Sequence, residues 1–137
     1  MVTLSGAAPH IRIARPSRDL AAAERFWSDG LGLDVLFRAS ADGPGEHDLL
    51  MLGWRDAGWH LELVGGRQLT AEPSPTAEDL LVVYLDAPVD GQLVARLERA
   101  GGTLVSGGPY WDRWGVTLAD PDGYRLVLST RGWTNAP

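Results

Sequence analysis

The order of the predicted elements occurs twice along the chain, and this repeat is the feature that most constrains the fold. Each half runs strand, helix, strand, strand, strand, and the second half follows the first at a spacing of roughly 70 residues. Glycines end the predicted helix in both halves, Gly30 and Gly32 in the first and Gly101 and Gly102 in the second. The predicted elements are 9–15, 17–30, 33–37, 49–54 and 59–64, then 80–85, 90–100, 103–105, 114–119 and 124–129.

A βαβββ unit of this size cannot cover both faces of its own sheet, so two such units must pack together. We expect modules at about 9–65 and about 79–130, joined by a linker over 65–79 that contains Gly65, Gly66, Pro73 and Pro75. The predicted fold class is α+β. A single domain over 1–137 would hold both modules, with a curled mixed sheet around a cavity.

The first helix has a predicted start and a predicted buried face. Ser17 follows a proline and is of a residue type that caps helices, so we expect it at the N-cap. Leu20, Ala23, Phe26 and Trp27 recur at spacings of three and four and should face the core.

Composition excludes several classes of function. The net charge of −6 argues against nucleic-acid binding, because neutralising phosphates requires a basic surface. The chain has no cysteine, which excludes disulfides, a thiol nucleophile and cysteine-ligated metal. No segment has the roughly 18 unbroken apolar residues of a membrane span, and the start has no signal-peptide pattern. We therefore expect a cytoplasmic protein without nucleic-acid or membrane partners.

Strand alternation predicts which side chains face the cavity. In the first strand Ile11 and Ile13 should face the helix, which leaves His10 and Arg12 on the cavity side. The same alternation in 59–64 places His60 and Glu62 toward the cavity, and Tyr84 is a further candidate from the strand 80–85. The predicted ligand-binding cluster therefore comprises His10, Arg12, His60, Glu62 and Tyr84.

The chain resembles the vicinal oxygen chelate superfamily, the glyoxalase/bleomycin resistance/dioxygenase-like proteins. The resemblance rests on the doubled element order and on two motifs, Arg15-Pro16-Ser17-Arg18-Asp19-Leu20 and Asp120-Pro121-Asp122-Gly123-Tyr124. It covers about residues 9–130 and implies the fold more strongly than any activity, because one fold hosts many chemistries.

The resemblance also implies where a metal would bind. Metal-using members carry a His or Glu ligand on four strands, at positions that fall here on Arg12, Glu62, Leu80 and Val127. Leucine and valine cannot ligate a metal, and an arginine would repel one. We therefore expect no metal and no other cofactor.

Glu62 is expected to form an ion pair with Arg12, whose guanidinium would stand in for the missing cation. Three alternatives remain open. His10, His60 and Glu62 could form an irregular site for zinc or iron, or the two histidines could simply be hydrogen-bonded at the cavity rim. Glu62 could also act as a general base, although a neighbouring arginine would weaken it in that role; it is the one weak catalytic candidate.

The segment 109–114 is a second candidate for ligand contact. It lies outside the regular periods and contains Trp111 and Arg113, which could stack on a flat or cationic ligand or, alternatively, pack at a dimer seam or cover the end of the barrel. Trp54 is undecided between the core and the cavity.

Three functions are consistent with these features. The first is a metal-free, homodimeric small-molecule-binding protein that resembles the bleomycin-binding type and sequesters a drug or metabolite, a role in antibiotic resistance. The second is a lyase, isomerase or dioxygenase with a divalent metal at the irregular His/Glu site. The third is a metal-free acid–base enzyme. The non-ligating residues at the expected metal positions favour the first.

Overall fold

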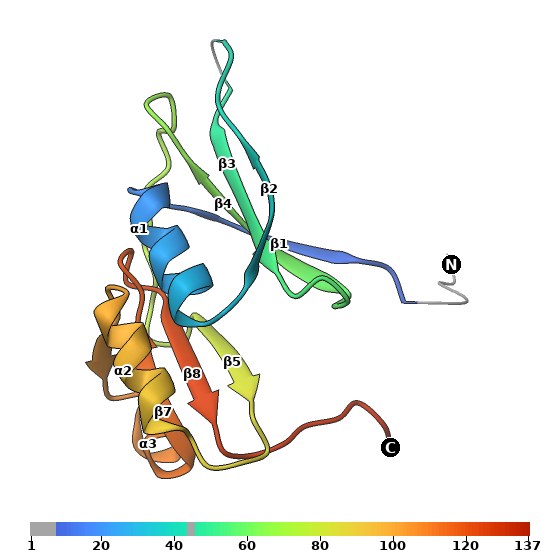
Figure 1. Cartoon of the computed structure of the whole chain (residues 1–137), viewed down its shortest axis with the longest axis vertical. Coiled ribbons are helices and arrows are strands. Elements are labelled where there is room, and N and C mark those ends of the chain that lie inside the picture. The colour runs from blue at the N-terminus through green and yellow to red at the C-terminus, as the bar shows by residue number, and fades with distance from the viewer. Residues whose placement is uncertain (1–7, 44–45) are drawn as a thin grey trace.

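The computed structural model describes residues 8–43 and 46–137 and contains, within these residues, two four-stranded mixed sheets (Figure 1). Their strand orders are β1-β4-β3-β2 and β5-β8-β7-β6, so the doubled order and the α+β class are confirmed. The first half comprises β1 (Ile11–Pro16), α1 (Leu20–Glu24), the π-helix η1 (Arg25–Gly30), β2 (Asp34–Ala39), β3 (Asp48–Gly53) and β4 (Trp59–Gly65). The second comprises β5 (Leu80–Tyr84), α2 (Gly91–Arg99), β6 (Thr103–Val105), α3 (Pro109–Trp114), β7 (Gly115–Ala119) and β8 (Arg125–Ser129).

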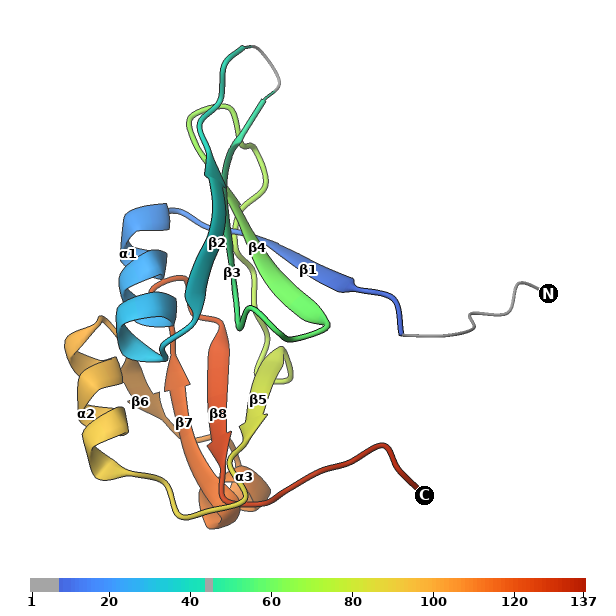
Figure 2. The same ribbon diagram turned by 45° about the vertical axis from the view of Figure 1, so that its right-hand side comes forward.

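The two sheets have matching pairings and do not close into a barrel. In each sheet one pair is parallel, β1 with β4 and β5 with β8, and the other neighbours are antiparallel. Figures 1 and 2 show the sheets one above the other, with α1 and α2 along the same side. In the part of the chain that the structure describes, no helix has the length and apolarity needed to cross a membrane.

A single hydrophobic core lies between the helices and both sheets. The predicted face of the first helix is confirmed, because Ala23, Phe26 and Trp27 are fully buried and Leu20 packs against them. Both sheets contribute leucines to this core, and α2 contributes one more; these are Leu50, Leu52, Leu61, Leu63, Leu97, Leu118, Leu126 and Leu128. The modules therefore share one core, as two units that cannot bury their own sheets must.

The end of the first helix packs closely against α2. A Cβ on Gly30 would lie 2.9 Å from Leu97 Cδ2, so glycine is needed for this approach. The Arg96 Nε donates to the carbonyl of Gly30 at 2.8 Å, which joins the two helices by a second interaction.

Two buried aspartates in the turn before β8 also connect the modules. Asp122 accepts hydrogen bonds from Ser17 Oγ at 2.6 Å and from the Arg18 backbone N–H at 2.9 Å. Asp120 accepts from Trp27 Nε1 at 3.0 Å and from two backbone N–H groups of its own turn. Burial raises the pKa of the Asp120 carboxyl, and these hydrogen bonds oppose that shift. We call these contacts of Asp120 and Asp122 the inter-module latch.

The latch overturns one prediction about the first helix. Asp19, not Ser17, is the N-cap, with its Oδ1 accepting from the Ala22 N–H at 3.1 Å. The Ser17 hydroxyl instead donates a hydrogen bond to Asp122. The strand β1 also continues through Pro16, one residue beyond its predicted end.

Two further predictions differ from the structure. Ile11 and Ile13 are 59% and 43% exposed, although they lie on the helix-facing side of β1, because β1 is an edge strand that extends away from the core (Figure 2). Residues 109–114 form the short helix α3, so Trp114 ends a helix and does not begin a strand.

The latch predicts a specific loss of stability. Asp122→Ala removes the acceptor of two hydrogen bonds to a charged group, and we expect it to lower the free energy of unfolding by about 2 kcal/mol. Urea unfolding measures this, with Asp56→Ala in the exposed β3–β4 turn as the control that stays within about 0.5 kcal/mol of wild type. Equal stability of the two variants would contradict the role assigned to Asp122.

Candidate functional site

Four of the predicted site residues meet where β1 lies beside β4. The parallel register pairs Arg12 with His60 and Ala14 with Glu62, so these side chains project from the same face of the sheet. Arg12 Nη1 lies 3.3 Å from Glu62 Oε1, and the predicted ion pair is thus confirmed. The Glu62 side chain is 10% exposed and that of Arg12 is 54% exposed, so the carboxylate is covered while the guanidinium reaches solvent.

The two histidines of this site interact with each other. His10 Nε2 and His60 Nδ1 are 2.7 Å apart, and the rings stack with their centres 4.9 Å apart. One of these nitrogens must donate and the other must accept, which a pair of neutral rings can satisfy. Burial, followed by the nearby His10 and Arg12, lowers the pKa of His60. The pair therefore has the hydrogen-bonded arrangement that was one of the sequence-based alternatives.

The second sheet shows which residues correspond to Arg12 and Glu62. Glu62 stands between two core leucines of β4, as Val127 does in β8. On β5, Leu80 lies two residues before Val82, which pairs with Val127. On β1, Arg12 likewise lies two residues before Ala14, which pairs with Glu62. The four positions where the resemblance implies metal ligands are thus equivalent in pairs between the two halves of the chain. Of the residues at these positions, Glu62 is the one whose side chain suits a metal.

The donor set of this site does not fit a metal ion. Within residues 8–43 and 46–137, no group of three His, Asp or Glu side chains is arranged to hold one. The guanidinium of Arg12 occupies the space beside Glu62 with a positive charge, and a cation placed there would be repelled.

An apolar groove lies between the first sheet and β5. It has a volume of about 430 Å³ and is lined by Ile13, Trp54, Trp59 and the whole of β5. The indoles of Trp54 and Trp59 meet edge to face with their centres 6.0 Å apart, and Trp54 is 40% exposed. Trp54, which the sequence left unassigned, therefore lines a groove of ligand-binding size.

Tyr84 belongs to this groove and is also covered from one side. Its ring is 42% exposed and stacks with Trp133 of the C-terminal segment, with the ring centres 6.3 Å apart. Alternation along β1 places Ile13, which lines the groove, on the opposite face from Arg12. Tyr84 and the Arg12–Glu62 pair therefore lie on different faces at the inner edges of the two sheets.

Trp111 and Arg113 lie on α3, at the far end of the second sheet from β1 in both views (Figures 1 and 2). Trp111 contacts Tyr110 edge to face, and the guanidinium of Arg113 lies 4.9 Å from the ring centre of Trp114. Arg131, which the sequence analysis missed, lies 4.6 Å from the same ring centre. No local pattern could have revealed this contact, because it joins a helix to the end of β8.

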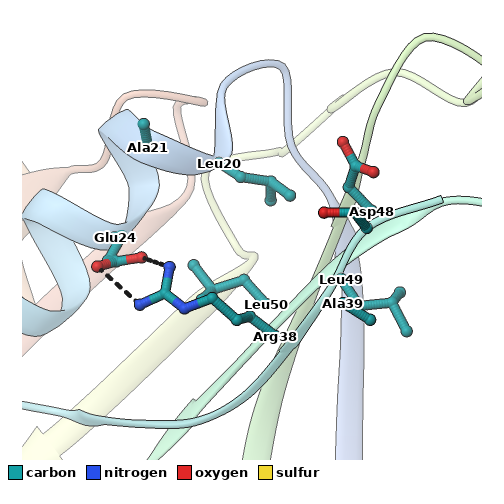
Figure 3. A pocket seen from close by; sticks show the side chains of 9 residues that line it. Leu20, Ala21, Glu24, Arg38, Ala39, Asp48, Leu49 and Leu50 are labelled. Carbon is teal, nitrogen blue, oxygen red and sulfur yellow. Dashed lines mark hydrogen bonds and ion pairs between the residues drawn. The ribbon is translucent and has the colours of Figure 1, made fainter.

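A different cavity, of about 290 Å³, lies between α1 and the β2–β3 hairpin (Figure 3). Its main polar feature is the ion pair between Arg38 and Glu24, with nitrogen–oxygen distances of 2.7 and 3.3 Å. It is lined by no aromatic or histidine side chain. This ion pair, which lies away from Arg12 and Glu62, is a matched control for theirs.

The lowered pKa of His60 predicts a loss of stability in mild acid. The unfolded chain protonates this histidine near its ordinary pKa of about 6.5, whereas the native state does so at lower pH. Protons therefore favour the unfolded state as pH falls below about 6.5. Wild type should lose more unfolding free energy than His60→Gln between pH 7.5 and 5.5, as measured by urea unfolding. Parallel losses in both proteins would show that His60 titrates normally.

Comparison with known proteins identifies the family. The YycE-like N-terminal domain matches residues 11–64 and the YycE-like C-terminal domain matches residues 78–130. The uncharacterized protein YycE of Bacillus subtilis (strain 168) is 36% identical over 123 residues, which cover 88% of this chain and 87% of that protein.

Solved structures agree with this assignment. The crystal structure of a Bacillus subtilis YycE protein of unknown function, assigned provisionally to the glyoxalase/fosfomycin resistance proteins, has a TM-score of 0.83 and 32% identity over 95% of both chains. Glyoxalase I of Leishmania major matches with a TM-score of 0.67 and 20% identity, over 90% of this chain and 86% of that one, and so shares the fold. The chain belongs to the YycE-like family and, with it, to the vicinal oxygen chelate superfamily.

Proposed function

We propose that the protein binds a small molecule without a metal and that Arg12, held by Glu62, is the polar anchor for this ligand. The observation that carries the proposal is the ion pair itself. At the site where the resemblance implies a metal, the one carboxylate is buried and pairs with a guanidinium that stays half exposed. The positive charge of the site is thus supplied by the chain.

Arg12 has unused hydrogen-bonding capacity for a ligand. A guanidinium carries five N–H donors, and the contact with Glu62 engages Nη1. Glu62 fixes the guanidinium in place and compensates part of its charge, so the remaining donors can bind a carboxylate or another acceptor without leaving a buried charge unpaired. His10 and His60 add further polar contacts on the same face.

The groove lined by Trp54, Trp59 and Tyr84 lies on the opposite face of β1 from Arg12, so it offers a second, separate binding surface for an apolar or aromatic group. Its volume of about 430 Å³ lies within the range of small-molecule pockets, and its aromatic walls offer stacking surfaces. Within one chain Trp111 and Arg113 lie on α3, away from β1. In the proposal they contact a ligand at Arg12 only when a second copy of the chain supplies them.

The proposal includes a homodimer. β1 and β5 are edge strands of their sheets, and β1 exposes Ile11 and Ile13. Exposed apolar edge strands are covered in most native proteins, and a second copy of the chain would cover these.

Cytoplasmic location belongs to the same proposal, since a chain without cysteine needs no oxidising compartment.

A metal-free acid–base enzyme is the second candidate. The observation that favours it is the lowered pKa of His60, which keeps a ring beside Glu62 in its neutral, proton-accepting form. Turnover of a ligand, measured by chromatography after incubation with the protein, would distinguish this candidate from simple binding.

A ligand screen tests the proposal. Thermal-shift measurements with antibiotics and aromatic metabolites should yield compounds that raise the melting temperature, and tryptophan fluorescence then gives the Kd. For an anionic hit, Arg12→Gln should weaken binding about tenfold or more, because a hydrogen bond to a charged group is lost. Arg38→Gln, which breaks the ion pair outside the site, is the control and should leave the Kd unchanged. Anionic hits that bind equally to both variants would refute Arg12 as the anchor.

A further inference from the structure

Three arginines line a small hollow where the two modules meet. The hollow has a volume of about 210 Å³ and lies between η1 and α2, lined by Arg25, Asp29, Arg96, Arg99 and Ala100. The end of η1 and the end of α2 lie beside each other in both views (Figures 1 and 2). Arg25 and Asp29 come from the first module, and the other residues come from the second.

The charges in this hollow are not balanced within the chain. No ion pair of Arg25, Arg96 or Arg99 with a carboxylate is formed in the described residues, whereas Arg12, Arg18, Arg38 and Arg55 each have one. Asp29 also lines the hollow, and among the described residues it forms no ion pair with these arginines. Three positive groups and one negative group thus share one concave surface of a protein whose net charge is −6.

The favourable interaction of basic residues with a helix C-terminus accounts for only part of this cluster. It explains Arg96 and Arg99, which lie in the last turn of α2, but not Arg25. Arg96 also donates a hydrogen bond from its Nε to the Gly30 carbonyl, and its two Nη groups take no part in that bond. Arg25 stands at the junction of α1 and η1, five residues before the end of η1, where the helix dipole offers no such stabilisation.

We infer that the hollow lined by Arg25, Arg96 and Arg99 binds a small oxyanion, a phosphate or carboxylate group, at a site separate from Arg12 and Glu62. Guanidinium groups bind such anions through pairs of N–H donors, and three of them around one hollow can do so together. The volume accommodates a single inorganic phosphate or a short dicarboxylate. Because its ligands come from both modules, the bound anion would join η1 to α2.

Two probes distinguish the chemical sources of the oxyanion. Wild-type protein is titrated with inorganic phosphate and, separately, with malonate in a buffer free of other multivalent anions, and binding is followed by calorimetry. Saturable binding of either probe supports the site and indicates its class, a phosphate or a carboxylate. The same anion should raise the urea midpoint of unfolding, because it binds the native state. Absence of saturable binding of both probes would overturn the inference.

Variants then locate the binding. Arg25→Gln and Arg99→Gln should each weaken binding about tenfold, and Asp29→Asn should strengthen it several-fold by removing the opposing charge. Arg131→Gln at the other end of the second sheet is the control, since that residue is an exposed arginine that also lacks a carboxylate partner in the described part of the chain. Arg96 is kept because it also binds Gly30.

The outcomes are separable. Circular dichroism and melting temperature in anion-free buffer confirm that each variant is folded, and Asp29→Asn provides a gain that a misfolded protein cannot show. Equal weakening by Arg131→Gln and Arg99→Gln would mean that the anion responds to overall charge and would refute a defined site. Binding that is unchanged in Arg25→Gln and Arg99→Gln would refute it as well.

Discussion

The hydrogen bonds of two buried aspartates determine how the two modules sit against each other. Asp120 and Asp122 are 6% and 7% exposed, and a carboxylate at that depth is costly unless its oxygens are hydrogen-bonded. Their partners are Trp27, Ser17 and the Arg18 N–H on the other module, together with N–H groups of their own turn. Any shift of one module against the other would break these bonds, and the shared leucine core would lose its packing at the same time.

The latch also places the candidate site. Ser17 follows directly after β1, the strand that carries Arg12, so the position of the ion pair is fixed relative to the second module. The four positions where the resemblance implies metal ligands are occupied by the Arg12–Glu62 ion pair in the first sheet and by Leu80 and Val127 in the second. Arg12 compensates part of the charge of Glu62, and its guanidinium remains a polar, half-exposed group at this site.

The sequence predicted those features that depend on local periodicity. Alternation along 9–15 and 59–64 predicted that Arg12 and Glu62 face one cavity, and the ligand positions implied by the resemblance paired them; the register of β1 with β4 places both on one face. Ser17 was misassigned because its partner, Asp122, lies 105 residues away and no local pattern reveals it. The helix α3 was missed because six residues are too short for an amphipathic period, although Pro109 at its start is a usual helix signal. The oxyanion hollow joins two modules and has no sequence signature at all.

Metal content tests the central claim most directly, namely that the guanidinium of Arg12 takes the place of a metal beside Glu62. The protein is incubated with zinc, iron, manganese and nickel, dialysed exhaustively and analysed for bound elements. The account predicts that wild type and Glu62→Gln retain equally little metal, because Arg12, Leu80 and Val127 cannot ligate it. About one metal ion per wild-type chain, lost in Glu62→Gln, would contradict the account.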